Sequence, residues 1–332
     1  MRKIKIHYVS GPIGDPTKEE KWGGTAATNY IIARSLEASD KYELVIRPRF
    51  TFLSMEEVKL FLDAGDIGWL DETSIANKYY LKGYDRPDVI GPICRSPVKR
   101  YQQGAWIADY TPEWFYSGVV LRLNEAEEKP EARLDTYKEH KAYKDINWED
   151  KITFIRHAID LTLLTPDYNS NKRYVLWAGN QGRDAKNFLM FKKIMEKVDK
   201  CGGLNGYEFK VLSDYNIKDY FDILDETALL INTSKYESFC CAVAEAMAKG
   251  VPTLVRKDFN GKYMFKDRPL QVEYEVNSYV NKIMELLDDE SGLKAQSLIA
   301  RQYAENNFSF DSMREDLERV FDNVIKEKNK VN

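Results

Sequence analysis

The sequence alternates between short apolar segments and helical patterns in two separate series, and this alternation restricts the possible folds most strongly. In the first series, apolar segments at residues 3–11 and 42–48 flank a helical pattern at 25–38. The second series has apolar segments at 173–179, 207–213, 227–234 and 251–256, separated by helical patterns at 184–200, 217–226 and 240–249. Strands that alternate with helices are typical of parallel, doubly wound sheets. We therefore predict an α/β protein with two Rossmann-like domains that face a cleft.

The length of the chain also favours two domains, because 332 residues exceed what one hydrophobic core usually holds. A polar linker near residues 166–172 separates the two series. We expect the first domain at residues 1–165 and the second at residues 166–307. Later strands of the first domain are expected within residues 66–70, 88–93, 117–123 and 152–160.

Apolar residues recur at helical spacing near the end of the chain, at Met313, Leu317, Val320, Phe321 and Val324. Such a stripe belongs to an amphipathic helix. We expect this helix to pack against its own chain, and docking onto a partner protein is the alternative.

The net charge of −4 argues against a general electrostatic grip on nucleic acid. One local cluster, Arg95, Lys99 and Arg100, leaves a basic patch open as an alternative to an ordinary solvated turn. No run of about 18 apolar residues is present, so no membrane-spanning segment is expected, whereas peripheral membrane contact stays open.

Four cysteines, Cys94, Cys201, Cys240 and Cys241, show no C-x-x-C spacing. We expect them to be reduced, as suits a cytoplasmic protein. The three histidines, His7, His140 and His157, have no metal-ligand spacing with one another or with the cysteines. No metal site is predicted.

The segment from Ser234 to Val255 carries the clearest candidate site. It follows a predicted strand, and ligands bind at the carboxyl ends of strands in open α/β sheets. The helix expected from about Cys240 would point its first N–H groups and its positive dipole end at that edge, which is favourable for an anion. The small residues Cys240, Cys241 and Ala242 would let a diphosphate approach the main chain.

Two glutamates flank this helix start. Glu237 lies just before it, and Glu245 lies about 12 Å further along at about 1.5 Å per residue. Carboxylates accept strong hydrogen bonds from sugar hydroxyls, so the spacing suits a sugar at either end of a diphosphate. Acidic residues also occur near helix starts as simple dipole partners, which is the alternative interpretation.

The pattern S-x-x-E-S-F-x5-E-A-M-A-x-G-V-P at residues 234–252 resembles the donor-site signature of retaining GT-B glycosyltransferases, in the large fourth sequence family (glycosyl transferases group 1). The likeness continues in four further segments, at residues 22–37, 152–160, 174–188 and 307–317. It is strong over residues 150–325 and weak from about 50 to 150. By this resemblance, residues 1–165 would hold the acceptor, residues 166–307 would hold the donor, and a last helix at 308–332 would cross back to the first domain.

The resemblance also implies roles for single residues. Glu237 would contact the hydroxyls of the donor sugar, and Glu245 those of the ribose. The amides of Phe239, Cys240, Cys241 and Ala242 would line the sugar and the phosphates. The pair Gly23 and Gly24 matches the donor-binding glycine loop of the first domain.

Lys186 matches the lysine that neutralises the departing diphosphate. The family usually has an arginine directly after the strand glycine, but Asn180 stands there, and Arg183 is the candidate substitute. Many relatives use a histidine near the donor sugar, and none of the three histidines here is assigned that role.

The resemblance therefore implies a metal-independent, hexosyltransferase-type enzyme that retains the anomeric configuration and uses a UDP- or GDP-linked sugar. Base contacts are expected around residues 214–220, and Trp106, Tyr110 and Trp114 are candidates to stack on an acceptor sugar. The acceptor class stays open among a glycan, a lipid-linked molecule, a small molecule and nucleic acid. Alternatives are a sugar-nucleotide epimerase of the same fold, a nucleic-acid glucosyltransferase and a non-catalytic sugar-nucleotide-binding module.

Overall fold

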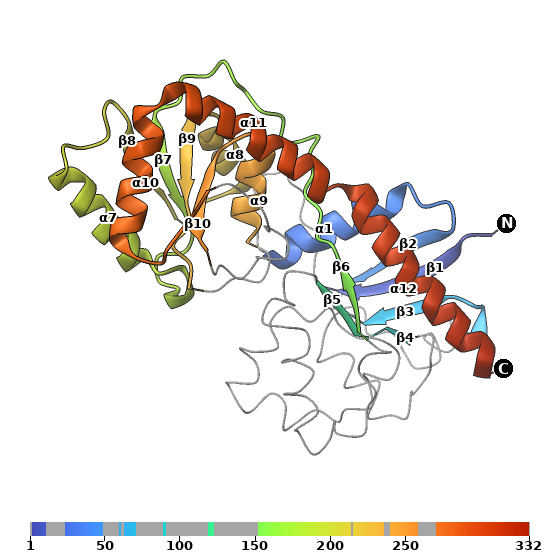
Figure 1. Cartoon of the computed structure of the whole chain (residues 1–332). Helices are drawn as coiled ribbons and strands as arrows, with labels where there is room; N and C mark the ends of the chain where they lie inside the picture. The colour runs from blue at the N-terminus through green and yellow to red at the C-terminus, as the bar shows by residue number, and fades with distance from the viewer. Residues whose placement is uncertain are drawn as a thin grey trace. The chain divides into compact units, whose positions relative to one another are not determined.

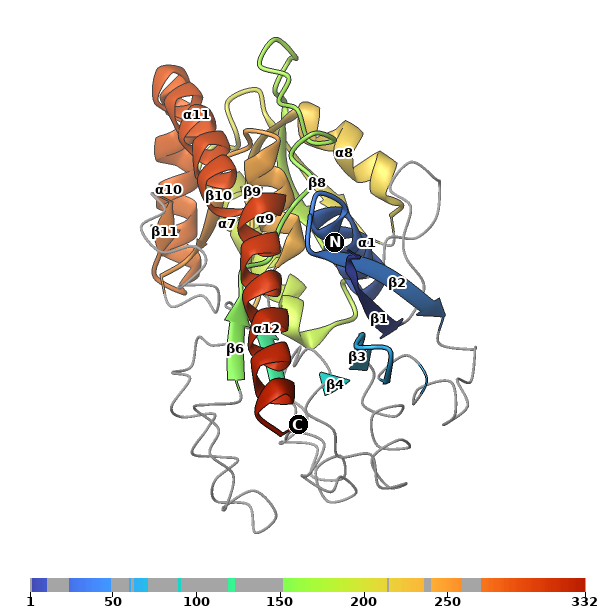
Figure 2. The same ribbon diagram turned by 90° about the vertical axis from the view of Figure 1, so that its right-hand side faces the viewer.

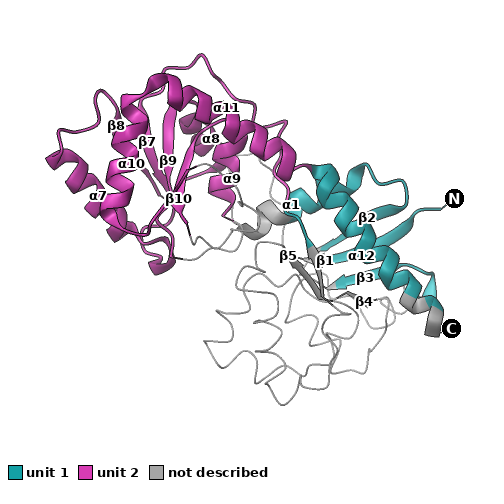
Figure 3. Cartoon of the chain, viewed as in Figure 1, with its two compact units in different colours: residues 1–14, 24–157, 310–332 teal, residues 15–23, 158–309 magenta. Residues whose placement is uncertain are grey.

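The computed structural model describes residues 2–10, 24–48, 60, 63–70, 89–90, 119–122, 152–213, 215–235, 240–257 and 270–331 (Figure 1). The chain divides into two compact units (Figure 3), which comprise residues 1–14, 24–157 and 310–332, and residues 15–23 and 158–309. The domain limits predicted from the sequence, residues 1–165 and 166–307, remain a prediction.

Unit 1 is built on parallel strands. Its elements are β1 (Ile4–Ser10), α1 (Gly24–Glu37), β2 (Tyr42–Pro48), β3 (Ile67–Leu70), β4 (Val89–Ile90), β5 (Val119–Arg122), β6 (Ile152–Ile155) and α12 (Phe310–Val331). One parallel sheet has the strand order β2-β1-β3-β4, and β5 pairs with β6 in a second. Every strand predicted for this part of the chain is present, and α1 begins at Gly24, one residue before the predicted helix start.

The C-terminal helix α12 packs against α1 and β6 of the same unit (Figure 2). Its five apolar stripe residues are all buried. The Phe321 ring lies 5.0 Å from the Tyr42 ring and 5.9 Å from the Trp69 ring, between centroids. The prediction that this helix packs against its own chain is therefore confirmed.

A buried carboxylate joins α12 to the end of β6. Asp316 is 3% exposed and accepts hydrogen bonds from the Arg156 backbone N and side-chain Nε, each at 2.8 Å. Arg319 adds a second guanidinium, with Nη2 3.0 Å from Oδ1 of Asp316. Charge-assisted bonds of this kind are among the strongest in proteins, so they set the position of α12 along the strand.

Unit 2 contains five parallel strands in the order β11-β10-β9-β7-β8. Its strands are β7 (Tyr174–Ala178), β8 (Glu208–Leu212), β9 (Thr227–Ile231), β10 (Thr253–Arg256) and β11 (Gln271–Val272). Its helices are η3 (Asp184–Lys186), α7 (Phe188–Lys200), α8 (Ile217–Asp225), α9 (Cys241–Ala248), α10 (Val276–Asp288) and α11 (Glu290–Asn307).

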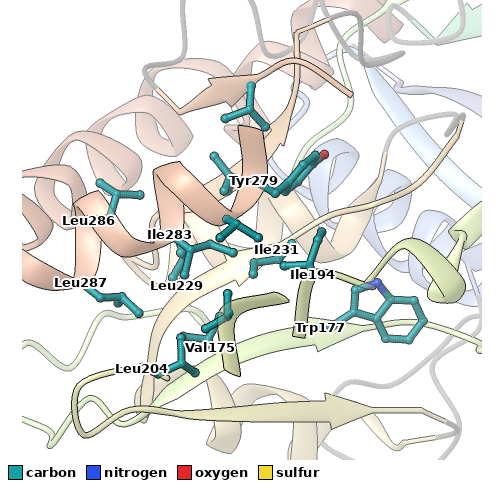
Figure 4. Packing of buried hydrophobic residues seen from close by; sticks show 14 of the residues in the cluster. Val175, Trp177, Ile194, Leu204, Leu229, Ile231, Tyr279, Ile283, Leu286 and Leu287 are labelled. Carbon is teal, nitrogen blue, oxygen red and sulfur yellow. The ribbon is translucent and has the colours of Figure 1, made fainter. Parts of the chain in front are cut away.

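The core of unit 2 forms where alternate strand residues meet two helices. Val175 and Trp177 of β7, two residues apart, face the same side of the sheet. They pack in one buried cluster with Ile194 of α7 and Ile283 of α10 (Figure 4). The indole nitrogen of Trp177 donates to the Thr233 hydroxyl at 3.0 Å.

The structure corrects one predicted helix and adds one strand. The helical pattern at residues 184–200 is broken at Asn187, which has a φ of 48° and separates η3 from α7. Asparagine tolerates this left-handed conformation better than most residues. The short strand β11 was not predicted, because two residues carry no detectable alternation.

Within the part of the chain that the structure describes, no helix is long and apolar enough to cross a membrane. In the same residues, Cys201, Cys240 and Cys241 form no disulfide.

Substitution of Asp316 by alanine is expected to lower the free energy of unfolding by about 2 kcal/mol or more, because the Arg156 groups lose a buried charged acceptor. Chemical denaturation measures this loss. Glu315→Ala is the matched control, since Glu315 also contacts Arg156, at 3.3 Å, but its side chain is 68% exposed. It is expected to cost less than about 1 kcal/mol, and equal costs for the two variants would contradict the anchoring role of Asp316.

A buried histidine is expected to make the stability of unit 1 depend on pH. His7 of β1 is 4% exposed, accepts from Arg47 Nε at 3.3 Å through Nδ1, and has Nε2 3.5 Å from Asp66. Burial lowers the pKa of His7 below its ordinary value of 6.5, Arg47 and Lys5 lower it further, and Asp66 opposes them. The folded state therefore binds this proton less readily than the unfolded state.

Unfolding free energy is expected to fall by about 1 kcal/mol as the pH drops from about 7.5 to about 5.5, because the unfolded state takes up the His7 proton first. The variant His7→Gln is expected to flatten this slope. Urea denaturation at several pH values tests both statements, and an unchanged slope in His7→Gln would show that other groups cause the dependence.

Candidate functional site

Two loops of unit 2 meet at the carboxyl edge of its sheet. β7 ends at Ala178 and leads through Gly179 to η3, while β9 ends at Ile231 and leads toward α9. Because β7 and β9 are parallel neighbours, both loops leave the sheet at the same edge. The structure therefore places the segment around Lys186 beside the segment that precedes Glu237 in the sequence.

Direct contacts hold these two loops together. The Thr233 hydroxyl lies 3.0 Å from the Lys186 carbonyl oxygen. The Lys235 backbone N donates to the Ala185 carbonyl at 2.8 Å, and the Lys235 ammonium lies 2.7 Å from Asp184 Oδ1. The exposed ion pair contributes little stability by itself, but the backbone bond and the hydroxyl set the register between the loops.

The stem of Lys186 passes close to the end of β7. A Cβ at Gly179 would lie 3.3 Å from the Trp177 ring and 3.4 Å from Lys186 Cδ. That spacing is tighter than ordinary contact, so the glycine leaves the room in which the half-buried Lys186 lies.

Asn180 and Arg183 form a turn between the strand and η3. Asn180 Oδ1 accepts from the Gly182 backbone N at 2.8 Å, and the Arg183 N donates to the Asn180 carbonyl at 3.1 Å. Lys186 N in turn donates to the Arg183 carbonyl at 2.9 Å. The Asn180 side chain thus stabilises the turn. Arg183 is an exposed cation three residues before Lys186.

Helix α9 begins next to this edge. Its N-cap residue Cys240 has a φ of 57°, and its sulfur accepts from Asn232 Nδ2 at 3.3 Å. The predicted residues Cys241 and Ala242 form the first turn, where backbone N–H groups have no acceptor within the helix. The helix starts one residue later than expected from the sequence.

Glu245 is buried on α9 at 7% exposure, and burial together with its charge raises the pKa of two tyrosines, Tyr215 and Tyr220. The Tyr220 hydroxyl donates to the Ala242 carbonyl at 2.6 Å, and its ring lies 5.2 Å from that of Tyr215. Burial raises the pKa of Tyr215, the charge of Glu245 raises it further, and Lys186 acts in the opposite direction. Lys186 and Glu245 therefore lie within electrostatic reach of the same hydroxyl.

Sequence patterns predicted base contacts around residues 214–220, a range that ends at Tyr220, but they did not single out Tyr215 or Thr233. An aromatic residue directly before the helix cap Asn216 was the available signal for Tyr215. No sequence pattern marks the contacts of Thr233, because they join residues about 50 positions apart.

Several predicted residues lie outside the described part of the chain. They are Gly23, Arg95, Lys99, Arg100, Trp106, Tyr110, Trp114, His140, Glu237 and Phe239. Gly24 is the first residue of α1 in unit 1, and His157 is buried at 1% exposure. Among the described residues, no three His, Cys, Asp or Glu side chains gather into a set that could hold a metal ion.

The structure is similar to solved structures along almost its whole length. Sucrose-phosphate synthase from Thermosynechococcus elongatus matches with a TM-score of 0.61 and 12% identity, over 98% of this chain and 100% of that one. HepE from Anabaena, solved in complex with UDP and glucose, matches with a TM-score of 0.55 and 13% identity, over 96% of this chain and 99% of that one. A putative UDP-N-acetylglucosamine 2-epimerase from Listeria monocytogenes matches with a TM-score of 0.57 and 13% identity, over 98% of each chain.

At these identities the similarity establishes the fold, which is the predicted GT-B arrangement of two parallel-sheet domains with a C-terminal helix on the first. A comparison with curated protein sequences finds no match. The model of the family described as Glycosyl transferases group 1 matches residues 189–306, a range that contains α9 and both glutamates and begins after Lys186. Residues 189–306 therefore resemble the glycosyl transferases group 1, and the fold of the chain is GT-B.

Proposed function

We propose that the protein transfers a hexose from a nucleotide-diphosphate donor to an acceptor, with retention of anomeric configuration and without a metal ion. The observation that carries this proposal is the convergence of three features at one sheet edge of unit 2. These are the Lys186 segment, the loop that leads to Glu237, and the first turn of α9.

The signs of charge along this edge support a donor with a diphosphate between two hydroxyl-bearing groups. Lys186, Arg183 and the α9 amides are positive and suit the phosphates. Glu245 is negative and buried one turn further inside the helix, where it suits the ribose hydroxyls. Glu237 is assigned to the donor sugar, and Tyr215 lies in the segment proposed to meet the base.

In the proposed reaction the acceptor hydroxyl attacks the anomeric carbon on the face from which the diphosphate departs. The bond from the anomeric carbon to the diphosphate oxygen breaks, the bond to the acceptor oxygen forms, and the acceptor proton moves to the departing phosphate. Lys186, Arg183 and the helix amides stabilise the charge that grows on the leaving group. Glu237 positions the sugar and forms no covalent bond to it.

A second candidate is epimerisation of a sugar nucleotide, favoured by the structural similarity to the putative UDP-N-acetylglucosamine 2-epimerase. The two functions use the same donor chemistry and differ in whether an acceptor gains the sugar.

A thermal-shift screen of UDP, GDP, ADP and TDP sugars identifies the donor, since a ligand that binds the folded state raises the unfolding midpoint. NMR with that donor and candidate acceptors, in the presence of EDTA, then distinguishes the outcomes. A product with the anomeric configuration of the donor supports the proposal. An isomerised free donor supports the epimerase, and binding without turnover supports a non-catalytic module.

Lys186→Ala is expected to lower kcat for sugar transfer about a hundredfold or more, because the departing diphosphate loses a preorganised cation. Arg183→Ala is expected to lower kcat less, by about tenfold, since Arg183 is exposed and its charge is screened by water. The exposed Lys193 on α7 provides the control, and Lys193→Ala is expected to keep wild-type kinetics. Full activity in Arg183→Ala would remove Arg183 from the mechanism.

Substitutions of the two glutamates are expected to differ in their effect on UDP affinity. Glu245→Gln should weaken UDP binding about tenfold, because the ribose loses a charged acceptor. Glu237→Gln should leave UDP affinity within about twofold and lower kcat for transfer, because its partner is the sugar that UDP lacks. Calorimetry with UDP and initial-rate kinetics test this split, and a similar loss of UDP affinity in both variants would contradict the assignment.

A further inference from the structure

The buried hydroxyl of Thr233 joins three separate elements of unit 2. Thr233 is 1% exposed, and Trp177 Nε1 of β7 donates to its Oγ1 at 3.0 Å. The same oxygen lies 3.0 Å from the Lys186 carbonyl and 3.2 Å from the Asn187 carbonyl. A threonine hydroxyl has one hydrogen to donate, so that hydrogen is shared between two carbonyls while a lone pair accepts from the indole.

A second set of hydrogen bonds, through the Tyr274 hydroxyl, also stabilises Asn187. Its Nδ2 donates to the Tyr274 hydroxyl at 2.7 Å, and that hydroxyl donates to the Thr233 backbone carbonyl at 2.9 Å. Thr233 therefore takes part in both supports of Asn187, through its hydroxyl and through its carbonyl. These contacts stabilise the left-handed conformation at the residue that ends η3.

The break at Asn187 decides where Lys186 points. In a continuous helix over residues 184–200, Lys186 and Met190 would lie on the same face, four residues apart. Met190 is buried in the core cluster of unit 2, so a lysine on its face would also turn toward the core. The break instead lets the Lys186 stem cross Gly179 at the carboxyl edge of the sheet.

We propose that Thr233 is a positioning residue for sugar transfer, whose hydroxyl maintains the break at Asn187 and thereby holds Lys186 at the phosphates of the donor. The role of Lys186 in this inference rests on the proposed function, whereas the effect of Thr233 on the Lys186 segment does not. Thr233 touches neither the donor nor the acceptor in this assignment and acts through Lys186.

The test compares Thr233→Val, which keeps the shape and removes the hydroxyl, with Thr233→Ser, which keeps the hydroxyl. Hydrogen exchange followed by mass spectrometry reads peptides that cover residues 183–190, at a temperature where every variant is folded. Thr233→Val is expected to exchange about tenfold faster there than wild type, and Thr233→Ser is expected to exchange within about twofold of wild type. Equal exchange in all three proteins would overturn the inference, whatever the protein binds.

Calorimetry with UDP measures the consequence for the site. Thr233→Val is expected to weaken UDP binding about tenfold, with Thr233→Ser restoring it, because a displaced cation loses its charge-assisted contact. If Lys186→Ala weakens UDP binding and Thr233→Val does not, the positioning role is wrong and the proposed function stands. If wild type binds none of the four nucleotides of the screen while exchange responds as expected, the proposed function is wrong and the structural role of Thr233 stands.

Tyr279→Phe is the matched control for loss of a buried hydroxyl. The Tyr279 hydroxyl donates to the Asn232 carbonyl at 2.9 Å, one residue before Thr233. This variant is expected to lose stability without faster exchange at residues 183–190. If Thr233→Val does not fold, Tyr274→Phe carries the test, because it removes the other support of Asn187, and unchanged exchange in that variant would also overturn the inference.

Discussion

The parallel pairing of β7 with β9 is the constraint on which the candidate site depends. Both strands end at the same edge, so the chain after each must turn away from the sheet within a few residues of the other. Gly179 after β7 leaves room for the Lys186 stem, and Thr233 after β9 reaches across to the Lys186 carbonyl. The lysine and the loop before α9 are therefore neighbours in space although they are about 50 residues apart in the chain.

Charges of both signs are arranged around this edge. The pKa of Tyr215 responds to Glu245 and Lys186 in opposite directions, which places a buried anion and a half-buried cation near one hydroxyl. Tyr220 adds a neutral contact, since its hydroxyl donates to a carbonyl in the first turn of α9. Partial burial strengthens these interactions relative to water, and the proposed donor is one whose phosphates and hydroxyls match that alternation of sign.

Local patterns predicted most of the elements and failed where distant contacts compete with local preference. Continuous apolar runs marked β7 and β9, which are buried on both faces of the sheet, and a stripe at helical spacing marked α12, which buries one face. The helical pattern at 184–200 was misleading, since every residue from Asp184 to Lys200 tolerates a helix. The break at Asn187 depends on hydroxyls of Thr233 and Tyr274, which local propensity does not include.

The sequence by itself determined the fold class, the likeness of residues 189–306 to the glycosyl transferases group 1 and the place of Glu245 within a helix, because these follow from periodicity and from motif spacing. Tertiary structure alone decided that Thr233 supports the Lys186 segment, that Asn180 serves a turn, and that Tyr215 lies near both charges. The physical reason is that hydrogen bonds and electrostatic contacts depend on distance in space. Chain spacing reports that distance only within a single helix, strand or turn.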